Sequence, residues 1–230
     1  MTESLTAPLS VAEIAAAREA ILSSAARRIP AAAMASQARA LGLWRQGGVR
    51  TAGEGQFLLA VDLAVFSPVG GHSRALDREA RARAGQEGTA EARVLAALAA
   101  ARFTLFRLGA PAPEGGTVAC EDLLTGEGFT LADARLSQPD MEGRGFAGRL
   151  MTIDGAQRTC GVCAPLTDAV VASLLGQPAP VAPMPEILPP LAPLDPAARA
   201  ALSARAAWAD FPTRVYAAVL HHNVMGQRPE

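Results

Sequence analysis

Residues 120–131 read CEDLLTGEGFTL and lie in the part of the chain, from about residue 102, where the pattern has changed from helical to strand-like. Apolar segments lie on both sides of Thr125 and Gly126. Glycine allows a tight turn to adopt a positive φ angle without steric cost. We therefore predict a β-hairpin whose turn contains Thr125 and Gly126.

Strand-like segments surround this hairpin at intervals of roughly ten residues. The run FTLFRL at residues 103–108 has strand composition, and later apolar runs occupy residues 117–121, 128–133, 146–153 and 157–163. Each run is bounded by glycine, proline or aspartate, which favour turns. The pattern predicts a small antiparallel β-module over about residues 102–164, either a meander or an SH3-like half-barrel.

Helical signals dominate the sequence before this module. Ser10 and Glu13 form a capping-box pattern, which predicts a helix beginning directly after Ser10. The stretch QFLLAVDLAVF at residues 56–66 fits both a helix face and a strand alternation, and its length and alanine content favour a helix. Further helices are predicted at residues 30–41, 73–83, 89–101 and 166–175, so we expect an α+β fold.

The C-terminal part divides at a proline-rich segment. Residues 177–196 contain eight prolines, which disfavour both a helix and an interior strand. We expect a compact domain over residues 1–176, a linker or strap over 177–196, and a helical arm over 197–230. The apolar residues of the arm require a packing surface, either within the chain or on another subunit.

Composition excludes several chemistries. All 21 basic residues are arginine, so Schiff-base chemistry, the lysine of a phosphate-binding P-loop and a lysine general base are excluded. The formal net charge of -1 provides no overall field for nucleic acid or an anionic membrane. Three cysteines and the absence of a targeting or membrane-spanning pattern predict a cytoplasmic protein. The enrichment in alanine, arginine, glycine and proline, with one tyrosine and one asparagine, is typical of a GC-rich bacterial genome.

A metal site is the alternative that the cysteines suggest. Cys160 and Cys163 have the C-x-x-C spacing that binds zinc or exchanges a disulfide, and Cys120 could add a third ligand. In a strand, however, residues 160 and 163 face opposite sides. The acids Asp122, Glu127 and Asp133 near the hairpin could instead bind a divalent cation or act as acid and base. Small apolar cysteines and a simple turn are the competing interpretations.

Other candidate groups lie outside the β-module. Asp62, His72, Asp77 and Arg78 would form a general-base cluster if the fold brought them together. The arginines of the predicted helix at residues 73–83 alternate with acids, which favours a solvated face over nucleic-acid contact. The adjacent histidines at 221 and 222 project about 100° apart on a helix, so we expect a surface or partner role for them.

The sequence also resembles a known group of proteins. The segments FLLAVDLAVFS (57–67), ARFTLFRL (101–108), EDLLTGEGFTLADARLS (121–137) and FAGRLM (146–151) are similar to a loosely defined group of uncharacterised bacterial proteins with a D-L-L-T-G-E β-module. Some members end in a zinc-binding SEC-C tail. The C-terminus here, RVYAAVLHHNVMGQRPE, has no cysteine, so that zinc site is not carried over. The resemblance implies that the turn at residues 122–127 is a fold signature.

These observations favour a non-enzymatic binding or adaptor protein whose C-terminal arm contacts a protein partner or a second copy of the chain. A zinc protein or metal-dependent enzyme using Cys120, Cys160 and Cys163 is the alternative, with Asp122 and Glu127 as a second possible ligand set. A nucleic-acid-associated regulator is the third hypothesis. We expect no cofactor other than a possible zinc ion.

Overall fold

The computed structural model describes residues 7–71, 73–86, 88–179, 187–222 and 224–225. The helices are α1 (Val11–Arg27), α2 (Ala31–Ala40), α3 (Glu54–Phe66), α4 (Ala75–Ala82), α5 (Ala90–Ala99), α6 (Asp168–Leu174), α7 (Pro196–Ala206) and α8 (Phe211–His221), with a short 3-10 helix η1 (Pro139–Met141). The strands are β1 (Trp44–Arg45), β2 (Gly48–Val49), β3 (Arg102–Pro111), β4 (Thr117–Asp122), β5 (Gly128–Ala132), β6 (Gly145–Ile153) and β7 (Ala156–Leu166). The predicted α+β class is confirmed.

Local signals in the sequence account for most of these boundaries. The Ser10 side chain accepts a hydrogen bond from the Glu13 amide, and the Glu13 carboxylate accepts one from the Ser10 amide, as a capping box requires. Thr89 and Asp195 cap α5 and α7 through a single hydrogen bond each, which the side chain accepts from the amides of Ala92 and Ala198. Residues 54–66 form helix α3, which resolves the ambiguity of that stretch in favour of a helix.

Strands β3 to β7 form a closed barrel in the order β3-β4-β5-β7-β6, with β6 paired back onto β3. The predicted meander holds only for β3, β4 and β5, and the half-barrel is wrong because the sheet closes. Strand β7 lies between β5 and β6 and pairs in parallel with β5, Leu131 being opposite Gln157. This is the strand order of oligonucleotide/oligosaccharide-binding barrels, although a shared topology does not establish a ligand.

The barrel interior is filled by apolar side chains. Phe106 is fully buried, and its ring centroid lies 6.1 Å from those of Phe129 and Phe146. Cys120 and Leu131 belong to the same buried cluster. The barrel is therefore a packed core and not a channel.

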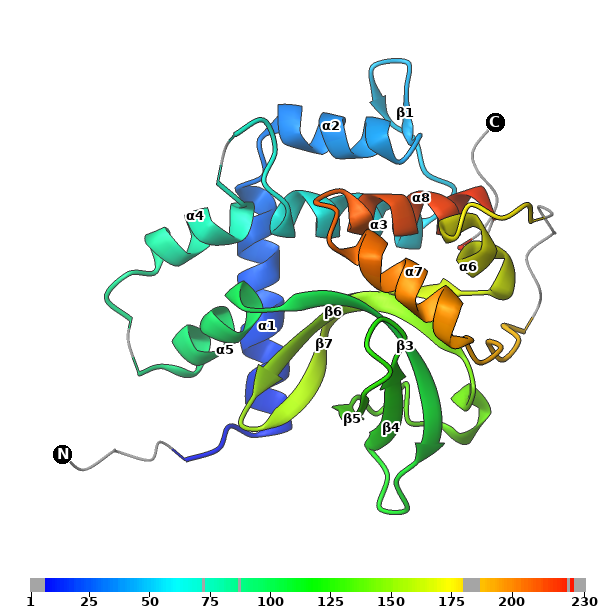
Figure 1. Cartoon of the computed structure of the whole chain (residues 1–230). Helices are drawn as coiled ribbons and strands as arrows, with labels where there is room; N and C mark the ends of the chain where they lie inside the picture. Colours follow the sequence, from blue (N-terminus) through cyan, green and yellow to red (C-terminus); the bar gives the residue numbers. More distant parts are fainter. Residues whose placement is uncertain (1–6, 72, 87, 180–186, 223, 226–230) are drawn as a thin grey trace.

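Helices cover one side of the barrel, as Figure 1 shows. Helices α1, α4 and α5 pack with one another and with β6 and β7 through a second buried cluster, in which Ile21, Leu76 and Leu98 are fully buried. A third cluster joins α2, α3, α6, α7 and α8 to the outer face of the barrel. No helix among the described residues is long and apolar enough to cross a membrane.

The C-terminal arm packs within its own chain. Val215, Tyr216, Val219 and Leu220 of α8 are fully buried in the cluster that contains α3 and α6. The described end of the strap also lies on this chain, because the Leu191 amide donates to the Gly143 carbonyl oxygen at 2.8 Å. The surface that the apolar residues of the arm require is thus provided in cis.

Candidate functional site

The D-L-L-T-G-E turn is held by one buried carboxylate. Asp122 is 1% exposed; its Oδ1 accepts hydrogen bonds from the amides of Leu124 and Thr125 at 2.9 and 3.3 Å. Its Oδ2 accepts from Thr104 Oγ1 at 2.9 Å and from Arg102 Nη1 at 2.6 Å. All four donors come from the folded chain, so Asp122 acts as a structural anchor of the turn.

The second acid predicted at this turn lies in solvent. Glu127 is exposed, and its amide donates to Thr125 Oγ1. The structure therefore gives Asp122 and Glu127 different environments and does not present them as a pair of free carboxylates.

The cysteines occupy two different apolar clusters. Cys120 and Cys163 pack in and against the barrel interior, whereas Cys160 lies in the cluster formed with α1, α4 and α5. Burial raises the pKa of Cys120 and Cys163 to about 12 and also raises that of Cys160. In the described parts of the chain, no three His, Cys, Asp or Glu side chains form a group that could hold a metal ion. The described residues therefore provide no preformed site that would support the zinc hypothesis.

A buried polar cluster links the helices to the barrel. The Asp62 Oδ2 atom of α3 accepts hydrogen bonds from Arg149 Nε of β6 and Tyr216 Oη of α8, each at 3.1 Å. Burial raises the pKa of Asp62, although the charge of Arg149 opposes the shift. The Arg149 guanidinium also lies 4.7 Å from the ring centroid of Phe66 and 5.5 Å from that of Phe103. These groups line neither the pocket between α2 and α3 nor the groove between α6, α7 and α8.

This arrangement does not assemble the general-base cluster expected from the sequence. Asp62 points into the core, while Asp77 pairs with Arg74 at 2.7 Å on the surface of α4. His72 lies outside the described residues. The sequence did not indicate Arg149 and Tyr216 as partners of Asp62, because they are separated from it by 87 and 154 positions.

The arginines of α4 and its flanking residues are bonded within the chain. Arg74 and Arg83 form ion pairs with Asp77 and Glu79, Arg78 donates to backbone carbonyl groups, and Arg81 donates to Ser73. These contacts explain the alternation of charges along the helix. Two of the four guanidinium groups are paired with carboxylates, which weakens the nucleic-acid hypothesis for this helix.

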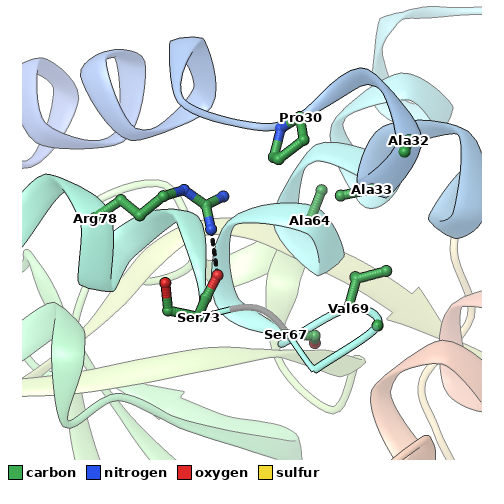
Figure 2. A pocket seen from close by; sticks show the side chains of 9 residues that line it. Pro30, Ala32, Ala33, Ala64, Ser67, Val69, Ser73 and Arg78 are labelled. Atoms are coloured by element: carbon green, nitrogen blue, oxygen red, sulfur yellow. Dashed lines mark hydrogen bonds between the residues drawn. The ribbon is translucent and has the colours of Figure 1, made fainter.

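The pocket in Figure 2 lies between the α1–α2 turn, α2, α3 and the loop before α4, with a volume of about 540 Å³. Pro30, Ala32 and Ala33 line one side, and Arg78 lies on the other. The Arg78 guanidinium donates to the Arg28 carbonyl oxygen through Nε and Nη2 and to the Ser73 carbonyl oxygen through Nη1. The charged group of this pocket is therefore used to hold α4 to the α1–α2 turn.

A second groove of about 550 Å³ lies between α6, α7 and α8. Trp208, in the turn between α7 and α8, is 46% exposed. The guanidinium carbon of Arg205 lies 5.9 Å from the Trp208 ring centroid, and that of Arg214 lies 4.8 Å from it. Both distances are within the range of cation–π attraction, so the two arginines orient the indole at the rim of the groove.

Further contacts fix the two arginines. Arg205 Nη2 donates to the Leu175 carbonyl oxygen at 2.9 Å, and Arg214 Nε donates to Asp210 Oδ2 at 2.8 Å. The hydrogen bond from Arg214 lowers the pKa of Asp210. Phe211 lies in the groove lining, and the exposed His221 completes it at the end of α8. The groove thus combines an aromatic anchor with a net positive rim.

The neighbouring histidine has a structural environment. His222 is 4% exposed, and its Nε2 lies 3.0 Å from Ser173 Oγ of α6. The surface role expected for this pair of histidines is wrong for His222, since the end of α8 turns its ring against α6. His221 is exposed, as expected.

The sequence reasoning did not select Trp208. The signal for it was present in the run AAWAD, where a tryptophan stands among small and acidic residues just after a predicted helix. Because tryptophan is large and rarely fully buried, this position was a candidate for a partly exposed indole.

A family model described as "Family of unknown function (DUF7986)" matches residues 18–181. The matched range contains the helical layer, the barrel and α6, and it ends before α7. Comparison with curated proteins and with solved structures gave no significant match.

Proposed function

We propose that this chain, which belongs to this family of unknown function, is a non-enzymatic binding or adaptor protein. It holds an acidic segment of a partner protein in the groove between α6, α7 and α8. The observation that carries the proposal is the exposed Trp208, positioned by Arg205 and Arg214.

The chemistry of the groove favours this occupant. Tryptophan and arginine are the side chains that most often dominate the energy of protein interfaces. Arg205, Arg214 and His221 favour an anionic ligand, and Asp210 is already paired with Arg214. The exposed part of the Trp208 indole can receive an aromatic or aliphatic side chain. An acidic peptide with one apolar anchor satisfies both features.

The test uses the small number of tryptophans. The chain has two, so a Trp44→Phe variant makes Trp208 the single fluorescent indole. A labelled peptide with a central phenylalanine flanked by aspartates and glutamates is titrated by fluorescence anisotropy, and Trp208 emission is recorded in parallel. We expect saturable binding that weakens with added salt, because rim charges are screened. A peptide with lysines in place of the acids should not bind.

Two variants locate the contact. Trp208→Ala and Arg214→Ala should each weaken binding about tenfold or more, a typical effect for an interface hot spot. Arg50→Ala removes an exposed arginine that does not line the groove and serves as the control. Equal binding of the acidic and lysine peptides, or equal loss in all three variants, would contradict the proposal.

Self-association is the competing use of the same surface. Sedimentation velocity of the purified protein distinguishes it: a concentration-dependent dimer that Trp208→Ala abolishes would show that a second copy of the chain occupies the groove. A monomer that binds the acidic peptide agrees with the proposed role.

A further inference from the structure

A cleft of about 680 Å³ separates the first half of α1 from one end of the barrel. The turn between β3 and β4 and the ends of β5 and β7 form its other walls. It is distinct from both the Trp208 groove and the pocket in Figure 2, with which it shares no lining residue.

Three arginines from three different parts of the chain line this cleft. Arg18 comes from α1, Arg135 from the segment after β5, and Arg158 from β7. Asp133 is the one acidic residue of the lining. Three positive charges and one negative charge give the lining side chains a net charge of +2.

The carboxylate of Asp133 already accepts hydrogen bonds from neighbouring residues of the chain. Asp133 Oδ1 accepts hydrogen bonds from the amides of Arg135 and Leu136 at 3.0 and 3.2 Å. Its Oδ2 accepts from Thr159 Oγ1 at 3.0 Å. Asp133 therefore shapes the segment after β5 and forms no ion pair with the three guanidinium groups.

The arginines, in contrast, retain unused donors. Arg158 Nε is buried and has no hydrogen-bond partner within the described structure. Arg18 uses Nη1 to donate to the Thr159 carbonyl oxygen at 2.8 Å, and the exposed Arg135 side chain forms no hydrogen bond or ion pair with the described residues. A buried donor without an acceptor is costly, and a shift of the partly exposed Arg158 side chain toward an anion in the cleft would give Nε its missing partner.

The rest of the lining is apolar or open. Val11 is 67% exposed at the mouth, beside Ala15 on the same helix. Gly115 and Gly116 have φ angles of +74° and +76°, and no heavy atom lies within 4 Å of a Cβ placed on either. The cleft therefore has room beside the arginines for a group larger than a simple anion.

We propose that this cleft binds an organic phosphate. The phosphate group accepts hydrogen bonds from Arg18, Arg135 and Arg158, whose planar guanidinium groups match its oxygens. A phosphate ester carries about -1.5 to -2 charges at pH 7, which complements the net charge of the lining, whereas a carboxylate carries one. The organic group lies along Val11 and Ala15.

Three probes separate charge from shape in titration calorimetry at low ionic strength. Phenyl phosphate combines a dianionic group with an apolar ring, phenyl sulfate has a similar shape with one charge, and inorganic phosphate lacks the ring. We expect phenyl phosphate to bind about tenfold more tightly than either of the others. Equal affinity for all three probes, or no binding of phenyl phosphate at millimolar concentration, would overturn the proposal.

Variants assign the contacts. Arg135→Ala removes an exposed side chain that forms no hydrogen bond or ion pair within the described structure, so the variant should fold normally and bind phenyl phosphate about tenfold more weakly. Arg158→Ala should give a similar loss. Arg45→Ala, an exposed arginine of β1 outside the cleft, is the matched control. An equal loss with Arg45→Ala would indicate nonspecific charge attraction and count against the site.

A single-stranded oligothymidylate tests whether the cleft binds the phosphates of a nucleic acid instead of a small organic phosphate. The cleft has no aromatic side chain in its lining on which a base could stack. We therefore expect the oligonucleotide to bind no more tightly, per phosphate, than inorganic phosphate. If the oligonucleotide binds more tightly than inorganic phosphate and Arg135→Ala abolishes this binding, then the ligand of the cleft is a nucleic acid and not a small organic phosphate.

Discussion

Glu79 shows how arginine stabilises this chain at the scale of single residues. Its side chain is 1% exposed, and its two oxygens accept hydrogen bonds from Arg28 Nε and Arg83 Nε, each at 2.5 Å. Ser24 Oγ adds a third at 2.9 Å. Burial alone would raise the pKa of Glu79, but the hydrogen bonds from Arg28, Arg83 and Ser24 outweigh it and lower the pKa. The carboxylate thus connects α1 to α4.

A Glu79→Gln variant should be less stable than the wild type at pH 7 by about 2 kcal/mol, since hydrogen bonds to a buried charge are lost. The folded pKa of Glu79 lies below its unfolded value, so its contribution is present above the unfolded pKa, about 4.3, and disappears as the pH falls through the folded value. Urea unfolding at pH 7 and at pH 4 or below measures this.

The stability difference between wild type and Glu79→Gln should therefore shrink at low pH. Glu19→Gln changes an exposed glutamate on α1 and should remain within about 0.5 kcal/mol of the wild type at both pH values. A difference for Glu79→Gln that grows as the pH falls would contradict the assigned sign.

At the scale of elements, the turn at residues 122–127 connects two parts of the molecule. Gly126 has a φ angle of +79°, and a Cβ placed on it would lie 2.6 Å from Arg199 Nη1 of α7. Arg199 also forms an ion pair with Glu121, the residue before the turn. The turn therefore contacts the C-terminal arm as well as closing the β4–β5 hairpin.

Gly126→Ala should lower the free energy of unfolding by about 1–2 kcal/mol for the left-handed backbone alone, with a further loss from displacing Arg199. Gly155→Ala is the matched control, because Gly155 has a φ angle of +77° and no atom within 4 Å of an added Cβ. Urea denaturation compares the two. A smaller effect for Gly126→Ala than for Gly155→Ala would show that the Arg199 contact contributes nothing.

The sequence predicted elements better than it predicted their pairing. Capping residues, glycine turns and short apolar runs are local, and they placed the helices and the strands of the barrel close to where they occur. Barrel closure depends on the pairing of strands that are distant in sequence, such as Phe103 of β3 opposite Arg149 of β6. No local pattern encodes which strand edge receives β7, so the parallel β5–β7 pair was missed.

The same limit applies to the candidate binding groove. The sequence indicated a C-terminal arm with a partner role, but the exposure of Trp208 depends on how α7 and α8 meet α6. The apolar face of α8 was recognised, and the structure buries it in cis. The outward-facing side of the arm, with Trp208 and Arg214, remains available for a partner.

At the scale of the whole molecule, the arm is part of the main hydrophobic core. Val215, Tyr216, Val219 and Leu220 of α8 have no exposed surface, and Tyr216 Oη also donates to the buried Asp62. Burial of each such side chain contributes about 1.5–3 kcal/mol. The four together are comparable to the net stability of a typical domain, which is about 5–15 kcal/mol.

A fragment of residues 1–196 should therefore not fold cooperatively, although it contains the whole β-module and the region matched by the family model. Removing α7 and α8 would expose the apolar face of α3 and leave Asp62 without the Tyr216 hydrogen bond. Circular dichroism melting and binding of a hydrophobic dye measure the outcome. The full-length Trp208→Ala variant should melt like the wild type, because that indole lies at the surface. A cooperative melt of the fragment would instead show that residues 197–230 form a separate unit, and the apolar face of α8 would then be available for exchange between copies of the chain.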